Sequence, residues 1–140
     1  MDLTSAAIAT LVSGLVNTVV TLNLFRRNDE KRLNDQLHDI IKLSVEYPYL
    51  EDKKFTNQWN TRNPDDERYT RYDNYCALVF NFLERLFEHY KYDVCKIEKF
   101  MDVKSWIRLH RHCWECPSTE FENTDGYDPR FRSIITEFLK

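Results

Sequence analysis

The chain has 140 residues and a net charge of −3, and it contains only 2 glycines and 4 prolines. The negative charge argues against a general nucleic-acid binder, because such proteins carry a clustered basic surface. So few glycines leave no Gly-rich phosphate loop and few tight turns, which favours a helical protein.

The first segment, Leu3 to Phe25, contains no Asp, Glu, Lys, Arg or His. An uncharged run of more than about 18 residues is a candidate transmembrane helix, since about 20 residues span the hydrocarbon core. A cleaved signal peptide fits less well, because the N-terminus lacks a basic residue and the run lacks a small-residue cleavage site. We therefore expect a transmembrane helix over 3–25 and one helical domain over 26–140.

Four basic residues follow this run directly: Arg26, Arg27, Lys31 and Arg32. Positive residues close to the end of a transmembrane helix stay on the cytoplasmic side. The chain is therefore expected to cross the membrane once, with its N-terminus outside and its helical domain in the cytoplasm. In that compartment the 4 cysteines are expected to be free thiols or metal ligands rather than disulfides.

One face of the predicted transmembrane helix carries small and polar residues, among them Gly14, Asn17 and Thr21. Small residues let helices approach closely, and an Asn in the bilayer gains a hydrogen bond across a helix interface. Self-association through this face is one interpretation. The other is a single anchor of low hydrophobicity in which Asn17 is merely tolerated.

Helical periodicity continues after the predicted anchor. Residues 28–46 form an amphipathic pattern that ends before Pro48, because the residue preceding a proline is disfavoured in a helix. Residues 51–62 are expected to form a short helix whose two aromatic side chains, Phe55 and Trp59, cover the core.

The strongest helix signal begins at Asn63, a predicted N-cap, with Pro64 in the first helical position. This helix is expected to run to about Tyr92, and its apolar residues cover more than one face. Such a helix has neighbours on several sides, so we expect it to be the central helix of the domain.

Three further segments complete the pattern: a short apolar segment over 94–101, a helix over 103–114 capped by Asp102, and a last helix that starts at Asp128-Pro129. The predicted fold class is therefore all-α. It consists of a single N-terminal transmembrane helix followed by a small cytoplasmic helical bundle of about four main helices.

Several short motifs belong to a known pattern: Arg71-Tyr72-Asp73-Asn74-Tyr75, Phe80-Asn81-Phe82-Leu83-Glu84, Asp102 with Trp106, and Tyr127-Asp128-Pro129-Arg130-Phe131. In these motifs, and in its layout over 3–140, the chain resembles a loose family of small bacterial proteins of unknown function. Those proteins have one N-terminal transmembrane helix and a helical cytoplasmic domain. The resemblance implies the same fold and a location in the bacterial inner membrane, and it carries over no catalytic residue.

The densest group of metal-ligating residues is His112, Cys113 and Cys116, which would share one face of a helix. A structural zinc site takes four Cys or His ligands. The fourth ligand would have to come from Cys76, Cys95 or His89. A lone Cys-x-x-Cys is a weak signal, and free Cys often acts as a small hydrophobic residue. We therefore expect no cofactor, with zinc at these three residues as the alternative.

No segment carries a catalytic signature, although the spacing of Arg32 and His38 is similar to that in a family of helical ribonucleases. The predicted function is that of a membrane-anchored interaction or regulatory module without catalysis, which binds a protein partner or a second copy of itself. Two alternatives stay open. One is an effector that disturbs the membrane by oligomerising through its anchor, and the other is a zinc-dependent or ribonuclease-like helical enzyme.

Overall fold

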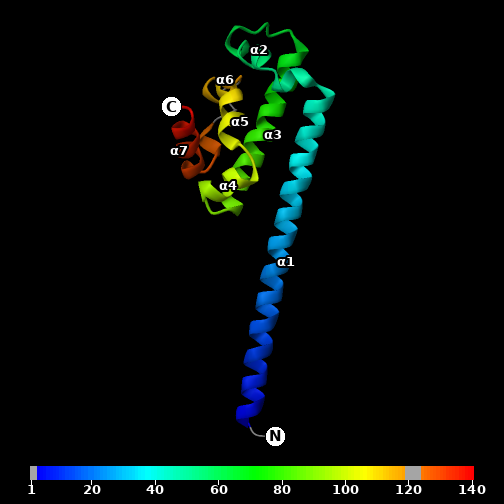
Figure 1. Ribbon diagram of the computed structural model, residues 1–140, viewed down its shortest axis with the longest axis vertical. Helices are drawn as coiled ribbons and strands as arrows, with labels where there is room; N and C mark the ends of the chain where they lie inside the picture. Colours follow the sequence, from blue (N-terminus) through cyan, green and yellow to red (C-terminus); the bar gives the residue numbers. More distant parts are fainter. Residues whose placement is uncertain (1–2, 119–123) are drawn as a thin grey trace. The chain divides into compact units, whose positions relative to one another are not determined.

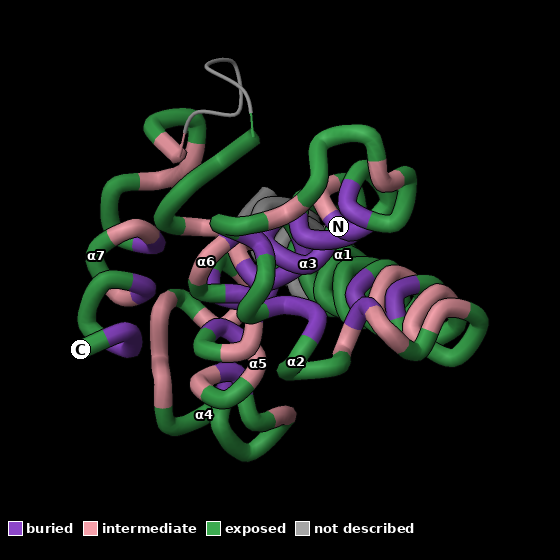
Figure 2. The backbone as a smooth tube through the Cα atoms, turned by 90° about the horizontal axis from the view of Figure 1, so that it is seen from above, coloured by how far each residue is buried: buried purple, intermediate pink, exposed green. Residues whose placement is uncertain are grey.

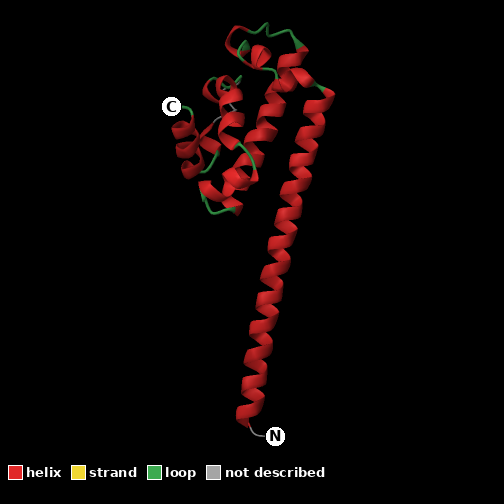
Figure 3. Ribbon diagram, viewed as in Figure 1, coloured by secondary structure: helices red, strands yellow, loops and turns green. Residues whose placement is uncertain are grey.

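The computed structural model describes residues 3–118 and 124–140; between residues 3 and 20, it describes the side chain of Thr18 alone. The regular secondary structure of these two ranges consists of seven α-helices and three short 3-10 helices, without a strand (Figure 3). The predicted all-α fold is therefore confirmed. The chain divides into two compact units, residues 1–35 and 36–140, which are described separately below.

Helix α1 (Leu3–Glu46) begins in the first unit and ends in the second (Figure 1). It contains no proline, so its backbone hydrogen bonds are not interrupted. It ends before Pro48, as predicted, and Tyr47 leaves the helical region with φ −126° and ψ 79°.

The predicted transmembrane helix over 3–25 is not supported by the structure. Among the described residues, we find no helix that combines the length and the apolar character needed to cross a membrane. Gly14 and Asn17, from the predicted self-association face, lie outside the residues whose side chains are described, whereas Thr21 is exposed. The transmembrane helix and self-association through it therefore stay predictions.

Helix α3 (Glu67–His89) is the centre of the second unit, as predicted. Its ten buried residues spread around more than one face: Tyr69, Tyr72, Tyr75, Cys76, Val79, Phe80, Phe82, Leu83, Leu86 and Phe87. The smaller helices of this unit are α4 (Val94–Phe100), α5 (Val103–Leu109), α6 (Arg111–Glu115) and α7 (Pro129–Phe138). Figure 2 shows that the buried positions gather where these helices meet α3.

Aromatic side chains join the smaller elements to α3. The ring of Phe87 lies 5.6 Å from that of Phe131 on α7, in an edge-to-face arrangement. At the other end of α3, Phe55 from α2 (Lys53–Thr56) stacks on Tyr69 at 4.5 Å, and Trp59 from η2 (Trp59–Thr61) is buried. The prediction that Phe55 and Trp59 cover the core is confirmed.

The predicted start of α3 is wrong. Asn63 and Pro64 precede the helix, and Asp66 is its N-cap, with a side chain that accepts a hydrogen bond from the backbone N–H of Arg68. The Asn63 side chain accepts instead from the backbone N–H of Asp65 at 3.1 Å, which closes a local turn. Asp66 also pairs with the guanidinium of Arg68 at 2.6 Å, an additional contact that favours the later start.

The predicted single helix over 103–114 is also wrong, because it divides into α5 and α6 at His110. This residue has φ −99° and ψ 16°, and its side chain is completely buried. Residues 103–114 contain no glycine or proline, so the break depends on the tertiary contacts of His110 with Glu51, Tyr72 and Cys76.

Two leucines of α3 allow a matched test of this core. Leu83 is completely buried, whereas Leu78 is 47% exposed on the same helix. We expect Leu83→Ala to lower the free energy of unfolding by about 2–5 kcal/mol, because it leaves a cavity. Leu78→Ala is expected to change it by about 0.5 kcal/mol or less. Urea unfolding of the full chain, followed by tryptophan fluorescence, measures both values, and equal effects would contradict the central position of α3.

Candidate functional site

A group of polar side chains lies inside the second unit around His110. We refer to Glu51, Tyr72, Cys76 and His110 as the His110 cluster. Tyr72 and Cys76 lie one turn apart on α3, so their side chains share a face. Glu51 is the last residue of η1 (Pro48–Glu51), and His110 lies between α5 and α6. Three separate parts of the chain therefore meet at one imidazole.

The carboxylate of Glu51 holds one side of the imidazole. Its Oε1 atom lies 3.4 Å from His110 Nε2 and accepts hydrogen bonds from Trp106 Nε1 at 2.8 Å and from the Tyr75 hydroxyl. Burial opposes the charged carboxylate, but the hydrogen bonds from His110, Tyr75 and Trp106 lower the pKa of Glu51 below its ordinary value. Burial and the nearby carboxylate raise the pKa of Tyr75, which therefore keeps the proton that it donates.

The other ring nitrogen, Nδ1, faces α3. It lies 3.0 Å from the Tyr72 hydroxyl oxygen and 3.8 Å from Cys76 Sγ. Burial alone would lower the pKa of His110, but hydrogen bonds with Cys76 and Glu51 and their negative charges raise it to about 9. The imidazole is therefore protonated at neutral pH, and both ring N–H groups have acceptors.

Cys76 is the negative partner of this imidazolium. Burial alone would raise the pKa of Cys76, but hydrogen bonds from Cys113, His110 and Tyr72 lower it to about 6. Between pH 6 and pH 9, the cluster therefore contains a Cys76 thiolate beside a His110 imidazolium, which Glu51 holds in place.

A second thiol, Cys113 on α6, lies next to Cys76. Its Sγ donates to Asp73 Oδ1 at 3.7 Å, and Ser118 Oγ donates to the other carboxylate oxygen of Asp73. The hydrogen bond to Cys76, burial and the Asp73 carboxylate all raise the pKa of Cys113 far above its ordinary value. The two neighbouring sulfurs thus differ in protonation, with a thiolate at Cys76 and a thiol at Cys113.

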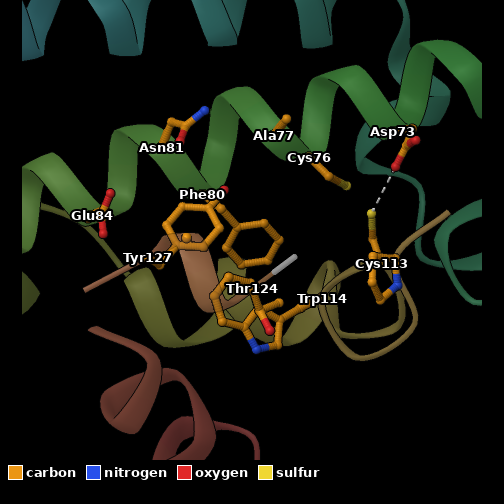
Figure 4. Close-up of a pocket in the computed structure, with 12 residues that line it drawn as sticks. Asp73, Cys76, Ala77, Phe80, Asn81, Glu84, Cys113, Trp114, Thr124 and Tyr127 are labelled. Carbon is orange, nitrogen blue, oxygen red and sulfur yellow. Dashed lines mark hydrogen bonds between the residues drawn. The ribbon is translucent and has the colours of Figure 1, made fainter. Parts of the chain in front are cut away.

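Both thiols line a cavity of about 300 Å³. Figure 4 shows Cys76, Cys113 and Asp73 together at one end of this cavity, with Asn81 and Glu84 toward the other end. Aromatic side chains form much of its wall: Phe80, Trp114 and Tyr127. Small molecules therefore have a space from which they can reach the two sulfurs.

A thiolate beside a histidine that a carboxylate orients is an arrangement that activates a nucleophile. Acyl transfer also needs hydrogen-bond donors for an oxyanion. Cys76 lies in the middle of α3, where the backbone N–H groups already bond within the helix. The arrangement therefore favours chemistry at sulfur over acyl transfer.

The three predicted zinc ligands do not come together. Cys113 is buried beside Asp73, Cys116 is exposed, and His112 Nδ1 lies 3.4 Å from the side-chain amide of Asn60. No group of three or more His, Cys, Asp or Glu side chains suited to a metal ion occurs within 3–118 and 124–140 where side chains are described. The backbone carbonyl of Cys116 instead accepts a hydrogen bond from Trp59 Nε1 at 2.7 Å.

Sequence reasoning missed the pairing of Cys76 with His110 and the part played by Glu51. One signal was present, because Cys76 and His110 each occupy an apolar stripe of the predicted helices. A histidine on such a stripe is buried and needs polar partners for its ring nitrogens. The identity of those partners depends on how the helices pack.

Comparison with known proteins gives no match: neither a family model, nor a curated protein, nor a solved structure matches this chain. Function is therefore inferred from the chain's own residues.

The charge state of Cys76 can be measured directly. In the Cys95→Ser, Cys116→Ser background, which removes the two exposed cysteines, only Cys76 and Cys113 remain. We expect the thiolate absorbance near 240 nm to rise with a midpoint of about pH 6, because Cys76 loses its proton there and Cys113 does not. Adding His110→Gln removes the positive partner and should move this midpoint upward. A midpoint that stays at the same pH would contradict the ion pair.

Proposed function

We propose that this chain is a membrane-anchored helical module of the bacterial inner membrane that binds a protein partner or a second copy of itself in a regulatory role, without catalysis. The observation that carries the proposal is the uncharged run over residues 3–25, which belongs to the continuous helix α1. At 1.5 Å per residue this run is about 34 Å long, compared with a hydrocarbon core of about 30 Å.

The charges that follow the run support an orientation with the helical domain in the cytoplasm. The four basic residues 26, 27, 31 and 32 are all exposed in α1. Near a cytoplasmic leaflet, each exposed Lys or Arg adds about 1 kcal/mol of attraction to anionic lipids. Positive residues this close to the end of a transmembrane helix stay on the cytoplasmic side.

Two exposed apolar side chains support partner binding by the second unit. Ile41 is 49% exposed and Val45 is 73% exposed, and the two lie one turn apart on the same face of α1. The neighbouring residue Ile40 is buried. Single exposed apolar residues are common, but a pair on one helix face suits contact with an apolar helix of a partner or of a second copy.

The orientation has a direct test. An enzyme reporter that is active only in the periplasm, fused after Lys140, is expected to be inactive, because the basic residues after the run keep that end in the cytoplasm. A cytoplasm-active reporter at the same site is the control and should be active. Strong periplasmic activity would overturn the proposed orientation.

Self-association through the predicted anchor has a second test. An unpaired amide within lipid costs free energy, so we expect Asn17→Leu to reduce cross-linked dimer in membranes by about threefold, the equivalent of about 0.6 kcal/mol. Insertion should persist, since Leu is more favourable than Asn in a bilayer. Asn23→Leu is the matched control, because it makes the same change near the end of the run. Equal effects of the two substitutions, or a wild-type chain that cross-links only as a monomer, would contradict this role of Asn17.

A further inference from the structure

The two thiols at one end of the cavity carry an inference that goes beyond the proposed function and does not depend on it. Cys76 and Cys113 come from different helices, 37 positions apart in the chain, and Figure 4 shows their side chains directed toward each other at one end of the cavity. The remaining two cysteines, Cys95 and Cys116, are exposed. Cys76 and Cys113 are therefore the buried pair among the four, and both also line the cavity.

The surroundings of the two sulfurs are unequal. Cys76 lies among hydrogen-bond donors, namely the Tyr72 hydroxyl and His110 Nδ1. Cys113 lies against an acceptor, the Asp73 carboxylate, at 3.7 Å. Donors stabilise a thiolate and an acceptor holds a thiol proton, so Cys76 is suited to attack and Cys113 to react afterwards.

We propose that Cys76 and Cys113 form a peroxide-reactive thiol pair, in which Cys76 is the attacking residue and Cys113 closes a disulfide with it. The ligand class is a small hydroperoxide, which fits a cavity of about 300 Å³. Low-pKa thiols that have access to small oxidants and lie beside a second Cys are the usual sites of such oxidation.

The reaction balances in two steps. In the first step, the Cys76 thiolate attacks the terminal oxygen of the hydroperoxide, the O–O bond breaks, and the leaving alkoxide or hydroxide takes a proton supplied by the His110 imidazolium. Cys76 is then a sulfenic acid, and the peroxide has been reduced to an alcohol or water.

In the second step, Cys113 attacks the sulfenic sulfur of Cys76. The S–S bond forms, the S–O bond breaks, and the departing hydroxide combines with the Cys113 proton to give water. The thiols lose two electrons in total, which the peroxide gains. The two thiols lie together at one end of the cavity, and their sulfurs must approach to about 2.05 Å to form the bond.

Oxidation would change the His110 cluster itself. The disulfide carries no charge, so His110 loses the negative partner near Nδ1 and keeps only Glu51 near Nε2. Helix α3 carries Tyr72 and Cys76, and His110 lies between α5 and α6. The oxidation state of Cys76 and Cys113 is therefore coupled to the packing of these three helices.

The experiment treats the reduced full chain with one equivalent of hydrogen peroxide and follows free thiols and intact mass. We expect the loss of two thiols and a digest in which the peptides containing Cys76 and Cys113 are joined, with reversal by dithiothreitol. Cys113→Ser should stop at a sulfenic acid on Cys76 that dimedone traps, and Cys76→Ser should leave Cys113 reduced.

The part played by His110 has its own readout. At pH 7, His110→Gln should slow the reaction severalfold, because it removes both the positive partner of the Cys76 thiolate and the donor of the proton for the leaving group. The rate of this variant should still rise with pH above pH 7, whereas the wild-type rate should be level there. His112→Gln is the matched control two positions later; its ring nitrogen Nδ1 lies 3.4 Å from the side-chain amide of Asn60, and the variant should keep the wild-type profile.

Three results would overturn the proposal. One is oxidation of Cys95 and Cys116 while Cys76 and Cys113 stay reduced. Another is a zinc content of about one ion per chain in the purified wild-type protein, with no zinc bound in the Cys76→Ser variant. The third is a wild-type oxidation rate that rises tenfold per pH unit up to pH 9, as expected for a thiol with an ordinary pKa. This measurement uses the wild-type chain alone, so it does not depend on whether a variant folds.

Discussion

Both ring nitrogens of His110 are buried, and each must find a hydrogen-bond partner inside the second unit. A buried polar group without a partner costs about 1–3 kcal/mol, and an unpaired buried charge costs more. The partners come from elsewhere in the sequence, Glu51 before α3 and Tyr72 with Cys76 on α3. This requirement fixes the relative positions of η1, α3 and the junction of α5 with α6, and it accounts for the helix break at His110.

The contacts that satisfy His110 also set the reactivity of Cys76. A pKa of His110 raised from 6.5 to about 9 contributes stability that is present below pH 6.5 and is lost as pH rises through 9. A pKa of Cys76 lowered from 9.0 to about 6 contributes stability that is present above pH 9 and is lost as pH falls through 6. The two contributions overlap between pH 6 and 9, so the ion pair of thiolate and imidazolium is most populated in the range where it stabilises the fold. Stability and reactivity at this site therefore have one physical origin.

Much of the fold follows from local sequence patterns. The all-helical class, the central position of α3 and the Asp128-Pro129 start of α7 were all predictable from helix periodicity and capping. The start of α3 was not, because Asn63 and Asp66 both suit a cap and only their hydrogen bonds decide between them. The cluster was harder still, since pairing of Glu51 with His110 links positions 59 residues apart. Proximity in the sequence also grouped Cys113 with His112 and Cys116. In the structure Cys116 lies beyond the end of α6 and is exposed, whereas Cys113 lines the cavity together with Cys76.

The energetics of burial explain why this cluster points to a function. Replacing buried charged groups with well-packed apolar residues is often neutral, or stabilises a protein by about 1–4 kcal/mol. The second unit already has a large aromatic core, in which Phe82, Phe87 and Phe131 are fully buried. Apolar residues in place of Cys76 and His110 could stabilise a fold of this kind as well as their ion pair does. What the ion pair does provide is a thiolate next to a protonated thiol, with both sulfurs lining a cavity, and this is chemistry that an apolar core cannot supply.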